Sequence, residues 1–256
     1  DTGMVYVRFG LNFGRSPAQI HEFSFDLTTS SSQYADPTVS ALNLPDGYGR
    51  LGGVQINGEN PGGLFGQSVA TGDFDGDGIC DVAISAGHYL SPLGPGKVYV
   101  IRGRTDIEGT ISLEEERAYY RSFVINGREN GDRFGEVLFL ADVDNDGRDD
   151  LIIGTPRADQ GGIVDIFYGR DFIPFFSQGV EALPTPHTKI ISGLSGEEFG
   201  AAFAAGDLNG DGMTDLAVAA PGYSGKANNA GRAFLFAGAA SDFDHGKPFP
   251  SGTILL

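Results

Sequence analysis

Three copies of one acidic, glycine-punctuated segment constrain the fold of this chain more than any other feature of its 256 residues. Each copy has a side-chain oxygen at positions 1, 3, 5 and 9 and a glycine at position 6. Each also follows a Phe-Gly pair at a fixed distance, because Phe65, Phe134 and Phe199 lie eight residues before the first Asp of their copies. The copies span residues 73–81, 142–150 and 207–215. A loop repeated in this register predicts a unit of architecture as well as a binding site.

The spacing of oxygen atoms in each copy suits a hard divalent cation. Ca²⁺ takes about six to eight oxygen ligands from carboxylates and backbone carbonyls, whereas Mg²⁺ demands strict octahedral geometry and fits less well. Glycine at position 6 permits the positive φ of a tight turn. The position-7 residues have no side-chain oxygen, so they could contribute only a backbone carbonyl. The sequence therefore predicts three Ca²⁺ sites, with the ligands Asp73, Asp75, Asp77, Ile79, Asp81, Asp142, Asp144, Asp146, Arg148, Asp150, Asp207, Asn209, Asp211, Met213 and Asp215.

Two alternatives to a calcium-binding β-turn compete for these segments. An EF-hand needs a bidentate Glu at position 12 and a helix after it. Position 12 is Ile84, Ile153 or Val218, and each segment continues into a β-type apolar stretch. Acidic turns without any metal are the other alternative, but three copies in register argue against it. A structural metal is favoured over a catalytic one, because no copy shows an open ligand position beside acid and base groups.

Two further elements repeat beside the acidic segments. One is a glycine, six strand-like residues and a second glycine, as in residues 3–10, 96–103, 162–169 and 231–238. The other precedes Phe-Gly, as in residues 54–58, 123–127 and 189–193. One unit then holds four short strands, which in the first complete unit are expected at about 67–73, 81–86, 97–102 and 122–126. Short strands between Gly and Pro turns predict an all-β fold, and a long-period repeat predicts a β-propeller.

Together these residues resemble the FG-GAP repeat. That repeat forms the blades of integrin α-subunit propellers, and it also occurs in the non-catalytic part of glycosylphosphatidylinositol-specific phospholipase D and in bacterial surface proteins. Its Gly-Ala-Pro element survives as Gly154-Thr-Pro156 and Ala219-Ala-Pro221 and has decayed to Ser85-Ala-Gly87. The resemblance covers about residues 54–256.

The resemblance implies that Ca²⁺ binds on one face of the propeller and that ligands contact the opposite face. That face is formed by the loops between the second and third strands and those between successive blades. The residues on these loops that suit recognition are His88, Tyr89, Arg157, Asp159, Tyr223, Lys226, Asn228 and Asn229.

The repeat boundaries predict one β-propeller domain over residues 1–256. A partial blade covers residues 1–58 and contains an insertion at 11–53, and complete blades follow at about 59–127, 128–193 and 194–256. Propellers need about four to eight blades, and the family usually has seven. The chain is therefore expected to be a segment of a longer polypeptide with a larger propeller.

Composition limits the choice of partners. The net charge of −17 argues against nucleic acid and anionic membranes as partners. The single cysteine, Cys80, excludes an internal disulfide, and at position 8 of its copy its side chain is expected to point away from the metal. No apolar run is long enough to span a bilayer. Carboxylate-rich loops of weak affinity suit the millimolar Ca²⁺ outside cells, so an extracellular or cell-surface location is predicted.

No catalytic motif is present in the sequence. The four histidines are scattered, and there is no zinc signature, nucleophile elbow or phosphate-binding loop. The predicted function is a non-enzymatic, calcium-stabilised adhesion or assembly propeller that binds a protein or glycan ligand, or the remaining blades of the same propeller. A non-catalytic propeller module of a secreted hydrolase is the alternative, and a calcium-dependent polysaccharide lyase is a weaker one.

Overall fold

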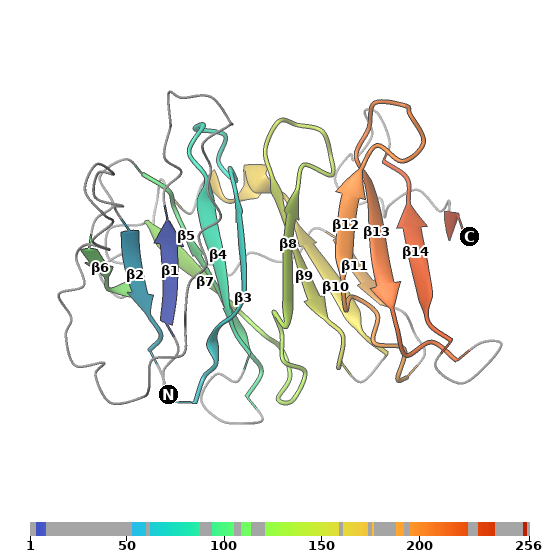
Figure 1. Ribbon diagram of the computed structural model, residues 1–256, viewed down its shortest axis with the longest axis horizontal. Helices are drawn as coiled ribbons and strands as arrows, with labels where there is room; N and C mark the ends of the chain where they lie inside the picture. The colour runs from blue at the N-terminus through green and yellow to red at the C-terminus, as the bar shows by residue number, and fades with distance from the viewer. Residues whose placement is uncertain are drawn as a thin grey trace, which may run out of the picture.

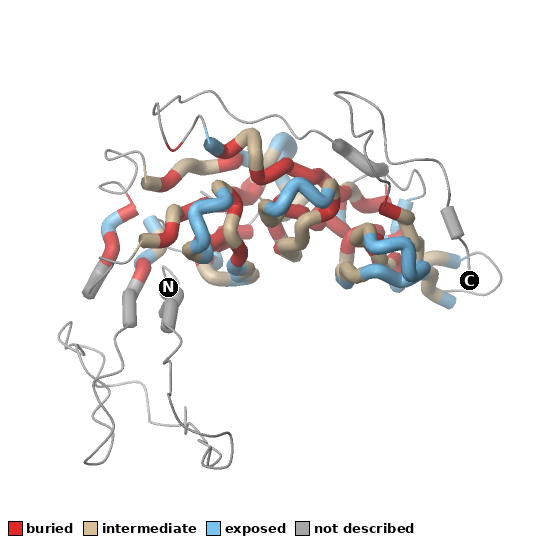
Figure 2. Tube along the Cα trace, turned by 90° about the horizontal axis from the view of Figure 1, so that it is seen from above, coloured by how far each residue is buried: buried red, intermediate tan, exposed pale blue. Residues whose placement is uncertain are grey.

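The structure, a computed structural model, describes residues 4–8, 53–59, 62–87, 94–104, 109–113, 121–158, 161–173, 176, 188–191, 195–224, 230–238 and 253–254. These residues form four β-sheets that stand next to one another in a curved row (Figures 1 and 2). Three sheets have four strands and one has three. The all-β fold expected from the sequence is confirmed. Among the described residues, no helix has the length and apolar character that a membrane crossing requires.

Each four-stranded sheet is an antiparallel meander in sequence order, and we call these sheets blades 1 to 3. Blade 1 consists of β3 (Phe65–Gly72), β4 (Asp81–Ala86), β5 (Lys97–Ile101) and β7 (Ser122–Asn126). Blade 2 consists of β8 (Val137–Ala141), β9 (Asp150–Thr155), β10 (Ile163–Phe167) and β11 (Thr188–Ile191). Blade 3 consists of β12 (Phe203–Gly206), β13 (Asp215–Ala220), β14 (Arg232–Phe236) and β15 (Thr253–Ile254). The four strands expected in blade 1 all form, within two residues of their predicted ends.

The first sheet contains a strand that the sequence did not predict. β1 (Met4–Arg8) pairs antiparallel with β2 (Gly53–Asn57), as expected for the last two strands of a blade. β6 (Gly109–Ile111) then adds to β2 in parallel. β6 comes from the connection between β5 and β7, so a segment of blade 1 extends the neighbouring sheet. Three residues are too few to show the alternation of a strand, and the parallel partner is more than fifty positions earlier in the chain. The insertion at 11–53 lies outside the described residues, apart from the first residue of β2.

The hydrophobic core is divided into one cluster between each pair of neighbouring sheets. β9 shows why its sequence is a continuous apolar run and not an alternating one: Leu151 and Ile153 pack towards blade 1, while Ile152 packs towards blade 3. All three side chains are fully buried. A strand covered on both faces needs apolar residues at successive positions. Packing between blades is therefore the main source of hydrophobic stabilisation.

The burial of the second residue of each acidic segment depends on whether a following blade packs against it. Phe74 is fully buried, and its ring packs edge-on against Phe172, which follows the short 3₁₀ helix η2 (Gly169–Asp171) of blade 2, with 5.2 Å between ring centroids. Val143 is buried in the cluster between blades 2 and 3. Leu208 occupies the same position in blade 3 and is 60% exposed. The position is thus buried where a following blade covers it.

Truncation at this position should distinguish the blades. Phe74→Ala is expected to lower the free energy of unfolding by about 3–5 kcal/mol, because it opens a cavity between blades 1 and 2. Leu208→Ala, the matched variant in blade 3, should change it by less than about 0.5 kcal/mol, as for most surface substitutions. Urea unfolding monitored by circular dichroism measures both. Equal losses in the two variants would contradict this division of the core.

Candidate metal centres

The three acidic segments connect the first and second strands of the blades. We call residues 73–81 loop 1, residues 142–150 loop 2 and residues 207–215 loop 3. In each loop the carboxylate at position 9 is also the first residue of the second strand, namely Asp81 of β4, Asp150 of β9 and Asp215 of β13. The loops therefore begin and end on strands whose register is fixed by the sheet.

The backbone of each loop turns through two left-handed residues. At position 6, Gly78, Gly147 and Gly212 have φ values of 84°, 86° and 85°. Position 4 is also left-handed, with Gly in loops 1 and 3 and with Asn145, at a φ of 56°, in loop 2. Asn is among the few non-glycine residues that adopt this region readily. The glycine spacing in the sequence thus reflects a turn that directs successive carboxylates to one side.

The carboxylate at position 1 holds the turn together. In loop 1, Asp73 Oδ1 accepts N–H groups from Gly76 and Asp77 at 2.8 and 3.1 Å, and Oδ2 accepts the N–H of Gly78 at 2.8 Å. Asp207 makes the same three bonds in loop 3. Such bonds to the ionised form favour it, and they lower the pKa of Asp207, with the Gly212 N–H contributing most.

The carboxylates at positions 3 and 5 each keep one oxygen free of the backbone. Asp75 Oδ1 accepts the N–H of Asp77 at 3.2 Å, and Asp77 Oδ1 accepts the N–H of Ile79 at 2.8 Å. Loop 2 repeats the pattern with Asp144 and Asp146. The Oδ2 atoms of these residues remain as ligands for a cation or a charged side chain.

The carboxylate at position 9 joins the loop to the end of the third strand. Buried Asp81 accepts the N–H of Phe74 at 2.9 Å and the N–H of Gly103 at 2.7 Å. A Cβ atom on Gly103 would lie only 2.2 Å from the carbonyl oxygen of Cys80, so the glycine is required by the close approach of the chain. The equivalent bonds hold loops 2 and 3 at Gly169 and Gly238. At all three glycines an added Cβ would lie within 2.6 Å of a carbonyl oxygen, so this close approach explains the glycine beyond the third strand of each blade.

The carboxylates of loops 1 and 2 converge closely enough to hold a cation. Ligand atoms of Asp73, Asp75 and Asp81 all lie within 4.8 Å of one another, as do those of Asp142, Asp144 and Asp150. Three hard oxygen donors on one turn fit the chemistry of a divalent cation. In loop 3, Asn209 replaces the second of these carboxylates, and its amide nitrogen donates to Asp211 Oδ2 at 2.9 Å.

Burial concentrates unfavourable negative charge in loops 1 and 2. Desolvation raises the pKa of Asp81 to about 7 and the pKa of Asp150 to about 8, despite two backbone N–H bonds to each. Desolvation also raises the pKa of Asp75 and of Asp144. These carboxylates therefore resist ionisation unless a positive charge lies beside them.

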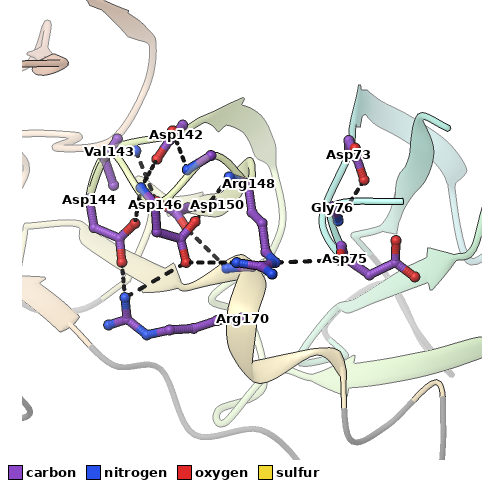
Figure 3. Close-up of polar contacts among 12 residues, drawn as sticks. Asp73, Asp75, Gly76, Asp142, Val143, Asp144, Asp146, Arg148, Asp150 and Arg170 are labelled. Atoms are coloured by element: carbon purple, nitrogen blue, oxygen red, sulfur yellow. Dashed lines mark hydrogen bonds and ion pairs between the residues drawn. The ribbon is translucent and has the colours of Figure 1, made fainter. Parts of the chain in front are cut away.

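Two arginines that the sequence prediction missed supply positive charge to these loops. Arg102 Nε lies 2.6 Å from Asp75 Oδ2, and its NH2 atom lies 3.0 Å from Asp77 Oδ2. In loop 2, Arg170 pairs with Asp144 Oδ2 (Figure 3). Both arginines adjoin the glycine that follows the third strand, and that position is the sequence signal that could have identified them. In loop 3, the described residues provide no such ion pair.

The backbone oxygens predicted as ligands remain a prediction. Ile79, Arg148 and Met213 lie at the expected turn, where the N–H of each donates to the carboxylate at position 5. Cys80, beside Ile79, is exposed.

Two of the residues predicted to bind a ligand, Arg157 and Tyr223, lie at the opposite end of the blades. In an antiparallel meander, the connection after the second strand lies at the end opposite the loop after the first. Arg157 follows β9 and pairs with Glu136, with Nε 3.0 Å from Oε2. Tyr223 follows β13, and the guanidinium carbon of Arg232 lies 3.5 Å from its ring centroid. The remaining predicted residues lie outside the described part of the chain, namely His88, Tyr89, Asp159, Lys226, Asn228 and Asn229.

Comparison with known families gives the repeat its name. The FG-GAP repeat family matches residues 65–101, 134–167 and 199–236, and each match runs from the Phe-Gly pair to the third strand of a blade. The chain contains three FG-GAP repeats. The position-9 carboxylates lie inside these matches and accept an N–H from the glycine two residues beyond the end of each match.

The relatives that share these repeats are much longer proteins. The chain is similar to integrin alpha-IIb of Mus musculus, with 32% identity over 207 residues that cover 75% of this chain and 18% of the relative. Similarity to integrin alpha-PS2 of Drosophila melanogaster is 31% over 209 residues, covering 70% and 14%. The phosphatidylinositol-glycan-specific phospholipase D of Rattus norvegicus is 27% identical over 202 residues, covering 78% and 22%. The chain thus spans less than a quarter of the length of each of these relatives.

The raised pKa values predict how the metal-free protein responds to pH. Asp81 and Asp150 bind protons more tightly when folded, so the folded state holds more protons than the unfolded state between pH 4 and 8. Stability must therefore fall as the pH rises through this window. Thermal unfolding of metal-free protein at pH 5, 6, 7 and 8 should show a decreasing Tm. Asp150→Asn, which cannot ionise, should show a smaller decrease in Tm over this range. A Tm of the wild-type protein that rises from pH 5 to 8 would refute the predicted pH dependence.

Proposed function

We propose that this chain is a calcium-stabilised segment of an extracellular adhesion or assembly propeller, which binds a protein or glycan ligand and has no catalytic role of its own. The observation that carries the proposal is the convergence of three carboxylates within 4.8 Å in both loop 1 and loop 2. The Asp residues at positions 1, 3, 5 and 9, with the carbonyl at position 7, are the proposed Ca²⁺ ligands. Loop 3 would bind a third ion through Asp207, Asn209, Asp211 and Asp215.

A structural role for the metal follows from what the carboxylates already do. Asp81, the first residue of β4, accepts one N–H from Phe74 at the start of loop 1 and one from Gly103 beyond the third strand, so a cation beside it would hold these three parts of the chain together. A bound Ca²⁺ would favour the ionised form of a carboxyl whose pKa is otherwise about 7. Free Ca²⁺ is abundant outside cells, where such loops would stay loaded.

Ligand recognition is assigned to the end of the blades opposite the loops. The candidate residues are His88, Tyr89, Arg157, Asp159, Tyr223, Lys226, Asn228 and Asn229. Tyr and Arg are enriched at binding hot spots, and Tyr223 with Arg232 forms a stacked pair at this end of blade 3. The similarity to integrin alpha subunits supports a protein ligand.

Association with further blades is a second proposed interaction. The face of blade 3 that points away from blade 2 exposes small apolar residues, including Ala204 on β12 and Ala233 on β14. Leu208 lies beside this face, at the position where Phe74 and Val143 are buried by the blade that follows theirs. Another FG-GAP blade, on the same polypeptide or a partner, would cover it in the same way.

One alternative function has specific support. The similarity to a phosphatidylinositol-glycan-specific phospholipase D covers 78% of this chain, slightly more than the integrin α matches. The same segment would then be a non-catalytic propeller module beside a hydrolase. The full polypeptide distinguishes the two, since a hydrolase domain on it would favour this alternative.

Calcium is expected to stabilise the protein. A ligand that binds only the folded state adds about 2.7 kcal/mol per site at one hundred times its Kd. Isothermal titration of metal-free protein should show three bound ions, and Ca²⁺ should raise the Tm more than equimolar Mg²⁺ does. Asp75→Ala should remove one ion from the stoichiometry. Cys80→Ala is the matched control, because Cys80 is an exposed neighbour in the same loop without an oxygen. The absence of both heat and a Tm shift with wild-type protein would refute the metal assignment.

A further inference from the structure

Loop 1 of blade 1 and loop 2 of blade 2 are hydrogen-bonded directly to each other. Asp149, at position 8 of loop 2, accepts the backbone N–H of Asp73 through its Oδ2 at 2.9 Å. The backbone N–H of Asp149 donates to the carbonyl oxygen of Asp73 at 3.0 Å. Both backbone polar groups of Asp73, the first residue in loop 1, are thus bonded to a single residue of the neighbouring loop.

A second contact reinforces this connection. The side chain of Arg148, at position 7 of loop 2, extends to loop 1 and donates from Nε to the carbonyl oxygen of Asp75 at 3.4 Å (Figure 3). Arg148 also pairs with Asp146 of its own loop at 3.4 Å. The residue whose carbonyl is a proposed ligand in loop 2 therefore touches a proposed ligand residue of loop 1.

Loop 1 is shaped to receive these two residues. A Cβ atom on Gly72 would lie 2.5 Å from Asp149 Oδ2, and a Cβ atom on Gly76 would lie 3.0 Å from Arg148 Nε. Gly72 is buried and ends β3, immediately before the loop. Larger residues at these positions would displace the contacts.

The next pair of loops lacks the connection. Thr214 has position 8 in loop 3, and Asp142 has position 1 in loop 2. Within the described residues, no hydrogen bond joins Asp142 to Thr214. Position 7 of loop 3 is Met213, which has no donor that could reach loop 2 as Arg148 reaches loop 1. The comparison provides an internal control in the same chain.

We propose that Asp149 couples the metal sites of loops 1 and 2, so that a cation bound in loop 2 raises the affinity of loop 1, while loops 2 and 3 bind independently. This inference rests on the proposed function, because it requires that the loops bind Ca²⁺. Metal in loop 2 would order positions 7 and 8, and these positions in turn hold Asp73 and Asp75 in place. A cation would then bind loop 1 at a smaller cost in conformational entropy, because these residues are already ordered.

The sign of the coupling separates this mechanism from simple electrostatics. Two bound cations repel each other, so charge alone would make the second ion bind more weakly, and salt would reduce the effect. Coupling through the Asp149 contacts has the opposite sign. By thermodynamic linkage it must also be reciprocal, with loop 1 raising the affinity of loop 2 by the same factor.

The experiment measures Ca²⁺ affinities by isothermal titration in protein whose loop 3 is disabled by Asp211→Ala. Disabling loop 2 with Asp144→Ala, which leaves the Asp149 contacts untouched, should weaken loop 1 by about five- to tenfold, as for typical coupling energies. Disabling loop 1 with Asp75→Ala should weaken loop 2 by the same factor. In protein with loop 3 intact and loop 1 disabled, disabling either loop 2 or loop 3 should change the Ca²⁺ affinity of the other by a factor near one.

Substitutions at position 8 test the role of Asp149 itself. Asp149→Ala should reduce the coupling factor to about one, whereas Asp149→Asn keeps an oxygen that accepts the Asp73 N–H and should preserve it. Thr214→Ala is the matched control and should change no affinity. If Asp149→Ala fails to fold by circular dichroism, Gly72→Ala displaces the same carboxylate from the other side and should also abolish the coupling.

The outcomes separate the coupling from the proposed function. Absence of Ca²⁺ uptake by every loop would overturn the proposed function and, with it, this inference. Uptake with a coupling factor of one or below in the wild-type loops would overturn the coupling alone. Equal loss of coupling in Asp149→Asn and Asp149→Ala would show that charge, and not the hydrogen bond, is responsible, and would also overturn it.

Discussion

The rest of the structure depends on a buried carboxylate at the start of the second strand of each blade. Asp81, Asp150 and Asp215 each accept one N–H from position 2 of their own loop and one from the glycine two residues beyond the third strand. These bonds fix the acidic loop against two strands. Burial of the carboxylate raises the pKa of Asp150 to about 8, although both N–H bonds act to lower it. The same carboxylate oxygens therefore hold the blade together and are proposed to bind the cation.

Blade packing extends this local arrangement across the molecule. Phe74 follows the first carboxylate of loop 1 and inserts against Phe172 of blade 2, while Asp149 of blade 2 bonds back to loop 1. Hydrophobic and polar contacts thus cross the same junction. Leu208, where no described blade follows, is exposed at the equivalent point. The ends of this arc differ from its middle because each blade buries surface of the one before it.

Much of the fold was predictable because the repeat is regular. Fixed distances between Phe-Gly, the acidic segment and the glycine-bounded strand placed the strands of blade 1 to within two residues. β6 could not be predicted, since its parallel partner β2 is distant in sequence and three residues carry no pattern. Arg102 and Arg170 were missed for a related reason. Their partners are identified only when the end of the third strand is folded next to the loop.

By itself, the sequence determined which residues have oxygen ligands, where the turns need a left-handed residue, and that the unit repeats. Those properties are local, because they depend on spacing along a few bonds of one loop. Only the tertiary structure decided which loops touch each other. Asp149 and Thr214 share one position of the repeat, yet only Asp149 bonds to a neighbouring loop, because the length of the side chain and the space left by Gly72 matter only once two blades are packed together.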